Sequence, residues 1–165
     1  MNATRTHTFI DSPIGPLTLV QTDGALSGLY LAEHRHRPDP ATFGSRTERG
    51  FEQVREQLDE YFAGDRTEFT MPLTLVGTEF QRSVWAALRA IEYGSTCTYA
   101  ELAAAIGRPT AIRAVAAANG RNPVSIVVPC HRVIGSDGTL TGYAGGLDRK
   151  RFLLDREFRT VHAPA

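Results

Sequence analysis

The chain has 165 residues, of which 42% are hydrophobic, and its formal net charge at neutral pH is zero. This length suits one large domain or two small ones, and the apolar content is sufficient for a core. No apolar run approaches the ~20 residues of a membrane span, and the first residues form no apolar signal segment. The two cysteines, Cys97 and Cys130, cannot make a disulfide framework and do not indicate structural zinc. We therefore expect a cytoplasmic protein with no membrane partner.

The charges are distributed unevenly along the chain. Residues 1–78 carry seven basic and eleven acidic side chains, whereas residues 79–165 carry eleven basic and seven acidic ones. A basic half indicates a polyanion partner, but two halves of opposite charge could equally attract each other. Charge alone leaves both interpretations open.

The first third of the chain predicts a small β-sheet. Strands are expected at residues 7–11, 17–22 and 25–32, because a Pro- and Gly-containing turn follows the first and Asp23-Gly24 is a strong hairpin signal after the second. These three strands would form an antiparallel sheet.

A loop and a helix should follow the sheet. Residues 34–47 are rich in His, Arg, Pro and Thr and are expected to form the loop. From about residue 48 to 63 the apolar residues follow helical spacing, and Gly64 is placed to end that helix. We predict a first domain over residues 1–75.

The remaining residues, 76–165, predict a mainly helical second domain. Thr78 and Gln81 have the spacing of a capping box at the start of a helix. This helix carries an apolar stripe that is more typical of a core than of a ligand surface: Phe80, Val84, Trp85, Leu88 and Ile91. The helix should end before Tyr93-Gly94-Ser95.

Two short helices over residues 98–107 and 110–120 are typical of a helix-turn-helix. Thr110 would cap the second helix and Gly120 would end it. The outer face of that helix would be mostly alanine, with Arg113 as its one long charged side chain. Such a face suits close backbone approach to a narrow groove better than base reading in a wide one. Alternatively, the alanines pack inside and Arg113 is a surface charge.

The segment Val127–Ile134 contains the most reactive residues of the chain. Cys130 stands beside His131 and Arg132, directly after Pro129. A neighbouring His or cation lowers the pKa of a thiol, and the thiolate is the nucleophile. Pro129 restricts the backbone, so we expect a stiff strand that presents Cys130. Adjacency alone is weak support, because most lone cysteines are inert core residues.

Several motifs in the order of this chain resemble those of the DNA alkyltransferases that repair guanine alkylated on its six-position oxygen. The resemblance covers residues 79–157 and rests on the following motifs: Phe80-Gln81-x3-Trp85, Thr98-Tyr99-x-Glu101-Leu102-Ala103, Arg113-Ala114-Val115, Asn122-Pro123, Pro129-Cys130-His131-Arg132-Val133, Tyr143-x-Gly145-Gly146-Leu147 and Lys150-x2-Leu153-Leu154-x2-Glu157. It implies an α+β fold in which a ribonuclease H-like sheet with one covering helix precedes a helical domain with a winged helix-turn-helix-like unit.

The resemblance also implies a reaction and its catalytic residues. Cys130 would accept the alkyl group irreversibly, so that the protein is consumed after one event. His131 would take the thiol proton through a water, and Glu157 would orient His131. Asn122 would hold the turn between the second helix and the Cys segment. The alkylated four-position oxygen of thymine could be a second substrate.

Further residues would bind the DNA and the lesion. Arg113 would replace the extruded nucleotide in the minor groove of double-stranded DNA, and Tyr99 would hold the flanking phosphate. Thr110, Ala114 and Ala118 would complete the DNA-binding helix. The base pocket would be lined by Tyr143, Val133, Ala144, Gly145 and Gly146. No cofactor and no metal are implied, and the protein would be a monomer that can cluster on DNA.

Three other functions compete with this interpretation. A Cys-His hydrolase would turn over, but it would leave the helix-turn-helix unexplained. A non-catalytic binder of alkylated DNA would not need Cys130. A transcription factor would normally present more base-reading side chains on its second helix.

Overall fold

The structure is a computed structural model that describes residues 3–162. Its N-terminal part is a sheet in the order β3-β2-β1-β4. The strands are β1 (Arg5–Ile10), β2 (Leu17–Thr22), β3 (Ala25–Leu31) and β4 (Ser45–Arg46). The first three are antiparallel neighbours, as predicted, whereas β4 runs parallel to β1.

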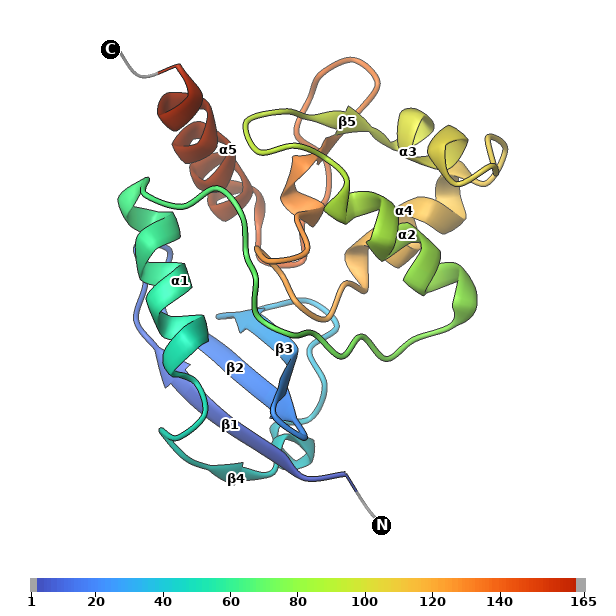
Figure 1. Cartoon of the computed structure of the whole chain (residues 1–165). Helices are drawn as coiled ribbons and strands as arrows, with labels where there is room; N and C mark the ends of the chain where they lie inside the picture. Colours follow the sequence, from blue (N-terminus) through green and yellow to red (C-terminus); the bar gives the residue numbers. More distant parts are fainter. Residues whose placement is uncertain (1–2, 163–165) are drawn as a thin grey trace.

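Helix α1 (Glu52–Ala63) packs on one face of this sheet (Figure 1). Its Leu58 and Tyr61 are fully buried. Gly64 ends the helix as predicted, because it adopts the left-handed conformation (φ 83°) and its N–H bonds the carbonyl of Tyr61 at 3.1 Å. The sheet and α1 therefore enclose the first part of the core.

The prediction of a plain loop over residues 34–47 is wrong. A short 3-10 helix, η1 (Pro40–Phe43), forms there because Asp39 accepts the Ala41 N–H at 2.9 Å and Pro40 begins the turn. Phe43 stacks on Tyr30 with ring centroids 5.6 Å apart. These two rings and Val20 form a small second apolar cluster on the sheet.

The C-terminal part contains four helices, α2 (Glu79–Arg89), α3 (Tyr99–Ala105), α4 (Ile112–Gly120) and α5 (Leu147–Val161). None of the helices within residues 3–162 is both long and apolar enough to cross a membrane. The predicted capping box of α2 is confirmed, and a second one, between Thr98 and Glu101, begins α3. Of the predicted stripe on α2, Val84, Trp85 and Leu88 are fully buried.

Two predicted helix boundaries are wrong. Thr110 does not cap α4, because that helix begins at Ile112 after Ala111 and has no side-chain cap. Helix α2 ends at Arg89, so Ile91 of the predicted apolar stripe lies outside the helix. Ala90 and Ile91 instead make tighter bonds to carbonyls three residues back.

The two parts share one apolar core that extends from the sheet to α5. Leu29 of β3 bonds the segment after α4, through its N–H to the Pro123 carbonyl at 2.9 Å and its carbonyl to the Ser125 N–H at 3.2 Å. The chain between α1 and α2 passes along this junction, and α5 lies near α1 (Figure 1). The sheet edge thus holds the segment that leads to Cys130.

Candidate active site

Cys130 begins a 3-10 turn, η2 (Cys130–Arg132), and the prediction of a strand at this position is wrong. The backbone turns repeatedly before it: Val128 N–H bonds the Val124 carbonyl at 3.0 Å, and Cys130 N–H bonds the Val128 carbonyl at 2.8 Å. Ile126 within this segment has φ 73°, a conformation that β-branched residues rarely adopt. Only after η2 does a strand follow, β6 (Val133–Ile134), which pairs with β5 (Cys97–Thr98).

Asn122 holds this turn at both ends, as its predicted hinge role requires. Its amide nitrogen donates to the Val128 carbonyl at 2.7 Å, and its amide oxygen accepts the Val124 N–H at 3.0 Å. The side chain is buried. The Asn122 amide therefore joins the start and the end of the turn before Cys130.

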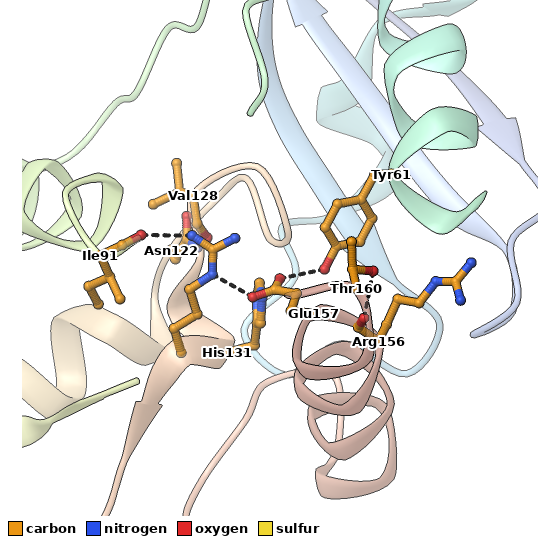
Figure 2. Close-up of polar contacts among 9 residues, drawn as sticks. Tyr61, Ile91, Asn122, Val128, His131, Arg156, Glu157 and Thr160 are labelled. Atoms are coloured by element: carbon orange, nitrogen blue, oxygen red, sulfur yellow. Dashed lines mark hydrogen bonds and ion pairs between the residues drawn. The ribbon is translucent and has the colours of Figure 1, made fainter. Parts of the chain in front are cut away.

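The Glu157 carboxylate on α5 has three hydrogen-bond partners (Figure 2). It lies 2.6 Å from His131 Nε2, accepts the Tyr61 hydroxyl at 2.6 Å, and accepts Arg132 Nε at 2.7 Å. Burial would raise the pKa of Glu157, but the charges and hydrogen bonds of His131 and Arg132 lower it to about 2. Glu157 is thus a buried carboxylate, and the expected contact with His131 is present.

Three buried polar atoms at the site have no hydrogen-bond partner within residues 3–162: Asn119 Oδ1, which can only accept, and two atoms that can exchange or donate a proton, His131 Nδ1 and the Tyr143 hydroxyl. No hydrogen bond joins the Cys130 thiol to His131 in the same residues, in agreement with the expectation that the two side chains do not meet directly. The three orphan atoms are therefore available to a ligand or a water.

Burial dominates the acid–base chemistry of the site. Burial raises the pKa of the Cys130 thiol, while the neighbouring Asn122 amide and the Lys150 ammonium oppose this rise. Burial also lowers the pKa of Lys150 to about 8, although its ammonium donates to the carbonyls of Val133 at 2.5 Å and Thr141 at 2.8 Å. The resting thiol is therefore protonated and needs a base to become a thiolate. The Lys150 ammonium would stabilise that thiolate.

Cys130 opens onto a cavity of about 340 Å³ that we call the thiol cavity. Its lining comes from α4, from the loop before α5 and from the N-terminal part: Arg35, His36, Tyr99, Ala116, Ala117, Asn119, Gly120, Cys130, Thr141, Gly142, Tyr143 and Ala144. Helix α4 thus forms one wall of the space into which the thiol faces.

The predicted pocket residues divide into two groups. Tyr143 and Ala144 line the thiol cavity, but Val133, Gly145 and Gly146 do not. Val133 is fully buried and offers its carbonyl to Lys150. Gly145 packs so closely on Leu31 that an added Cβ would lie 2.7 Å from that side chain, so this glycine serves the contact with the sheet.

The predicted DNA-binding residues differ in their exposure to solvent. Arg113, Ala114 and Thr110 are exposed, and Tyr99 is half-buried at the start of α3. Ala118 is buried, because the inner face of α4 packs on α2 and the Ala118 carbonyl accepts the Trp85 indole N–H at 2.9 Å. The expectation that Ala118 contacts DNA is therefore wrong.

Several residues of the site were not predicted. Tyr61 and Lys150 reach it from α1 and α5, and Arg35 and His36 reach it from the loop after β3. A lysine within an apolar helical stripe was a possible signal for Lys150. No local pattern distinguishes Tyr61, Arg35 or His36, because their roles depend on contacts between distant segments.

Two family models match the chain. The model described as 6-O-methylguanine DNA methyltransferase, DNA binding domain, matches residues 79–159. The model described as 6-O-methylguanine DNA methyltransferase, ribonuclease-like domain, matches residues 6–75. Together they cover residues 6–75 and 79–159, which are most of the N-terminal part and most of the helical part.

Curated relatives and solved structures agree with this match. The chain is 53% identical over 156 residues to a methylated-DNA–protein-cysteine methyltransferase of Mycolicibacterium paratuberculosis, covering 94% of this chain and 93% of the relative. It is 47% identical to the protein of that name from Methanosarcina barkeri, over 92% of this chain and 96% of the relative. The Mycobacterium tuberculosis OGT solved in complex with DNA superposes with a TM-score of 0.89 and 49% identity, over 97% of this chain and 96% of that one.

Proposed function

This chain belongs to the 6-O-methylguanine DNA methyltransferase family, and we propose that it repairs DNA by moving an alkyl group from the six-position oxygen of guanine to Cys130. One observation carries the assignment to this residue. Cys130 lines a cavity of which helix α4 forms one wall, and it directly precedes His131 of the buried His131–Glu157 pair.

The thiol is activated by His131. Its Nε2 is held by Glu157 at 2.6 Å, so Nδ1 is the nitrogen that can receive a proton, and Nδ1 has no partner within residues 3–162. A water between Nδ1 and the thiol would relay that proton. The Glu157 carboxylate then stabilises the imidazolium, as the acid does in other triads, and the Lys150 ammonium stabilises the thiolate.

The transfer is a single displacement. The thiolate sulfur attacks the alkyl carbon, the bond from that carbon to the guanine oxygen breaks, and the electron pair stays on the base. The Tyr143 hydroxyl can donate a hydrogen bond to that oxygen, because burial raises the pKa of Tyr143 well above its usual value and keeps the group protonated. The product is a thioether, so each molecule acts once, without a cofactor or a metal.

The base must leave the DNA stack to reach Cys130. Arg113 lies on the exposed face of α4, and Ala116 and Ala117 of the same helix line the thiol cavity. A helix laid in the minor groove would therefore place Arg113 in the stack while the cavity receives the extruded nucleotide. Tyr99, whose hydroxyl lies 3.4 Å from the Thr141 carbonyl at the cavity rim, would hold the neighbouring phosphate.

The remaining assignments complete the proposal. We place a division between two domains at residues 75 and 76, and we expect a monomer that works in the cytoplasm, where both free cysteines stay reduced. Thr110 and Ala114, both exposed beside Arg113, would contact the DNA backbone.

Mass spectrometry tests the transfer directly. The chain is incubated with duplex DNA that carries one 6-O-methylguanine, digested, and the two cysteine peptides are compared. We expect one methyl group on Cys130 per molecule of protein and none on Cys97, which lies outside the thiol cavity. The variant Cys130→Ser should take up no label, and Cys97→Ser should be labelled like the unaltered chain.

The competing functions predict other results. Repair of more than one lesion per protein molecule would indicate a turning-over enzyme such as a hydrolase. Binding of the methylated duplex with no methyl group on Cys130 would indicate a non-catalytic damage binder.

A further inference from the structure

A second cavity, of about 330 Å³, lies at the junction of the two parts of the chain, and we call it the junction cavity. Strands β1 to β3, the loop after β3 and η1 supply one side, and α2 and the end of α4 supply the other. It shares Arg35, His36 and Gly120 with the thiol cavity. The alkyl transfer described above assigns no chemical step to its arginines.

The junction cavity is lined by positive charge with no compensating acid. Arg5, Arg35 and Arg121 line it together with two histidines, and none of its lining residues is Asp or Glu. Within residues 3–162 the guanidinium groups of Arg35 and Arg121 make no hydrogen bond or ion pair, and that of Arg5 bonds the Thr42 carbonyl at 3.2 Å. Three exposed arginines from three separate segments thus line one space whose lining contains no acidic residue.

His34 adds a ring N–H donor to this cavity. Its side chain is more than nine-tenths buried, and its Nδ1 accepts the Leu31 N–H at 3.2 Å. Because Nδ1 is an acceptor, Nε2 carries the ring proton, and Nε2 has no partner within residues 3–162. Burial and the positive charges of Arg37, His36 and Arg149 lower the pKa of His34 to about 4, so the ring is a neutral donor in a positive surrounding.

We propose that the junction cavity binds a phosphate group, held by Arg5, Arg35 and Arg121 and by a hydrogen bond from His34 Nε2. Planar guanidinium groups bind phosphate oxygens through two parallel hydrogen bonds. Thr22, Ser27 and Thr42 also line the cavity, but their hydroxyl groups already hydrogen-bond within the protein, so the donors to the phosphate are the guanidinium groups and His34. The phosphate is either a backbone phosphate of DNA or a free phosphate, since both present the same oxygens.

Nuclear magnetic resonance of the whole chain tests the site. The imidazole signals of His34 are followed while inorganic phosphate replaces sodium chloride at constant ionic strength. We expect a saturable change at His34 and a Kd that rises at least threefold in Arg5→Ala and in Arg121→Ala. Arg49→Ala is the matched control, because Arg49 is an exposed arginine of the same part of the chain and lies outside the cavity.

The opposite results would overturn the proposal. They are a linear change without saturation, or one Kd shared by the unaltered chain, Arg5→Ala and Arg121→Ala. Arg5 and Arg121 lie in different parts of the chain, so a local folding defect in one variant would leave the result from the other variant valid. The site does not depend on alkyl transfer, so methylation of Cys130 would still be observed if the junction cavity bound no phosphate.

Undamaged duplex DNA then distinguishes the two sources of phosphate. A backbone phosphate in the cavity predicts that duplex displaces inorganic phosphate from His34. It also predicts that Arg5→Ala lowers the slope of log K against log salt by about one. A free phosphate predicts that both bind together and that Arg5→Ala leaves the slope unchanged. Either result supports a phosphate site in the junction cavity and identifies which kind of phosphate binds there.

Discussion

Glu157 shows how single contacts set the chemistry of a buried group. A carboxylate that is 1% exposed would be unfavourable without compensation. The donors from Tyr61, His131 and Arg132 provide it, and they come from two different elements, α1 and η2. The same carboxylate therefore orients the proposed base and connects α1, η2 and α5.

The pKa of Glu157 predicts how stability depends on pH. A carboxyl with a lower pKa in the folded than in the unfolded protein stabilises the fold above its unfolded pKa of 4.5, and this contribution is lost as pH falls towards about 2. We expect Glu157→Gln to lower the free energy of unfolding at pH 7 by about 3 kcal/mol. Between pH 4.5 and pH 2 the variant should lose less stability than the unaltered chain. Urea unfolding at several pH values measures both.

The matched control for Glu157→Gln is Asp155→Asn. Asp155 lies two residues earlier on α5, is exposed, and makes no side-chain hydrogen bond within residues 3–162. Its replacement should change the free energy of unfolding by less than about 0.5 kcal/mol. Equal pH profiles for Glu157→Gln and the unaltered chain would show that the carboxylate is not stabilised by its three donors.

Elements whose ends carry a local signal could be predicted from the sequence. The Asp23-Gly24 hairpin, the Thr78 capping box and the Gly64 helix end form where expected, because each depends on residues within a few positions of one another. The turn at Cys130 could not be predicted. It is held by Asn122, whose amide replaces the strand partner that an extended segment would need.

The site was likewise predictable only in part. The motifs indicated Cys130, His131, Asn122 and Glu157. In the structure Glu157 contacts His131, and Asn122 holds the turn that leads to Cys130. Tyr61 lies 96 residues from its partner Glu157, and no periodicity along the chain encodes such a pair. The burial of Ala118 depends on where α2 packs, which the alanine pattern alone does not determine.

The proposed role of Arg113 on α4 predicts that its replacement affects the repair of duplex DNA and methyl transfer from a free base differently. Arg113→Ala removes the side chain proposed to fill the stack but leaves the thiol cavity intact. Since extrusion costs a few kcal/mol, we expect repair of methylated duplex to slow by about tenfold or more, while methyl transfer from free 6-O-methylguanine stays unchanged. Stopped-time assays of label on Cys130 with both substrates measure the two rates.

A second arginine serves as the control for Arg113→Ala. Arg82 is exposed on α2 and makes no side-chain hydrogen bond or ion pair within residues 3–162. Arg82→Ala should slow duplex repair far less than Arg113→Ala does, because it removes only one exposed positive charge. An equal loss on duplex and on free base in Arg113→Ala would exclude the extrusion role.

At the scale of the whole molecule, the thiol cavity depends on how the sheet and the helical part are joined. Arg35 N–H bonds the Ala144 carbonyl at 2.7 Å, so the loop after β3 directly supports the loop that carries Tyr143. Arg149 adds bonds to the Ile14 carbonyl at 3.0 Å and the Ala32 carbonyl at 2.5 Å, and it also bonds Gly145. One guanidinium thus fixes the sheet, α5 and the cavity loop to one another.

These contacts predict that Arg149→Met lowers the stability of the protein and also slows methyl transfer to Cys130. The variant leaves three carbonyls without their charged donor, and hydrogen bonds to charged groups contribute about 1.5–3 kcal/mol each. We expect the free energy of unfolding to fall by at least about 2 kcal/mol, protease to cut residues 64–78 faster, and methyl transfer to Cys130 to slow even from free base. Arg151→Met, at an exposed position two residues later on α5, should change none of the three by a comparable amount. A stable Arg149→Met variant with normal transfer would mean that the helical part forms the thiol cavity without support from the sheet.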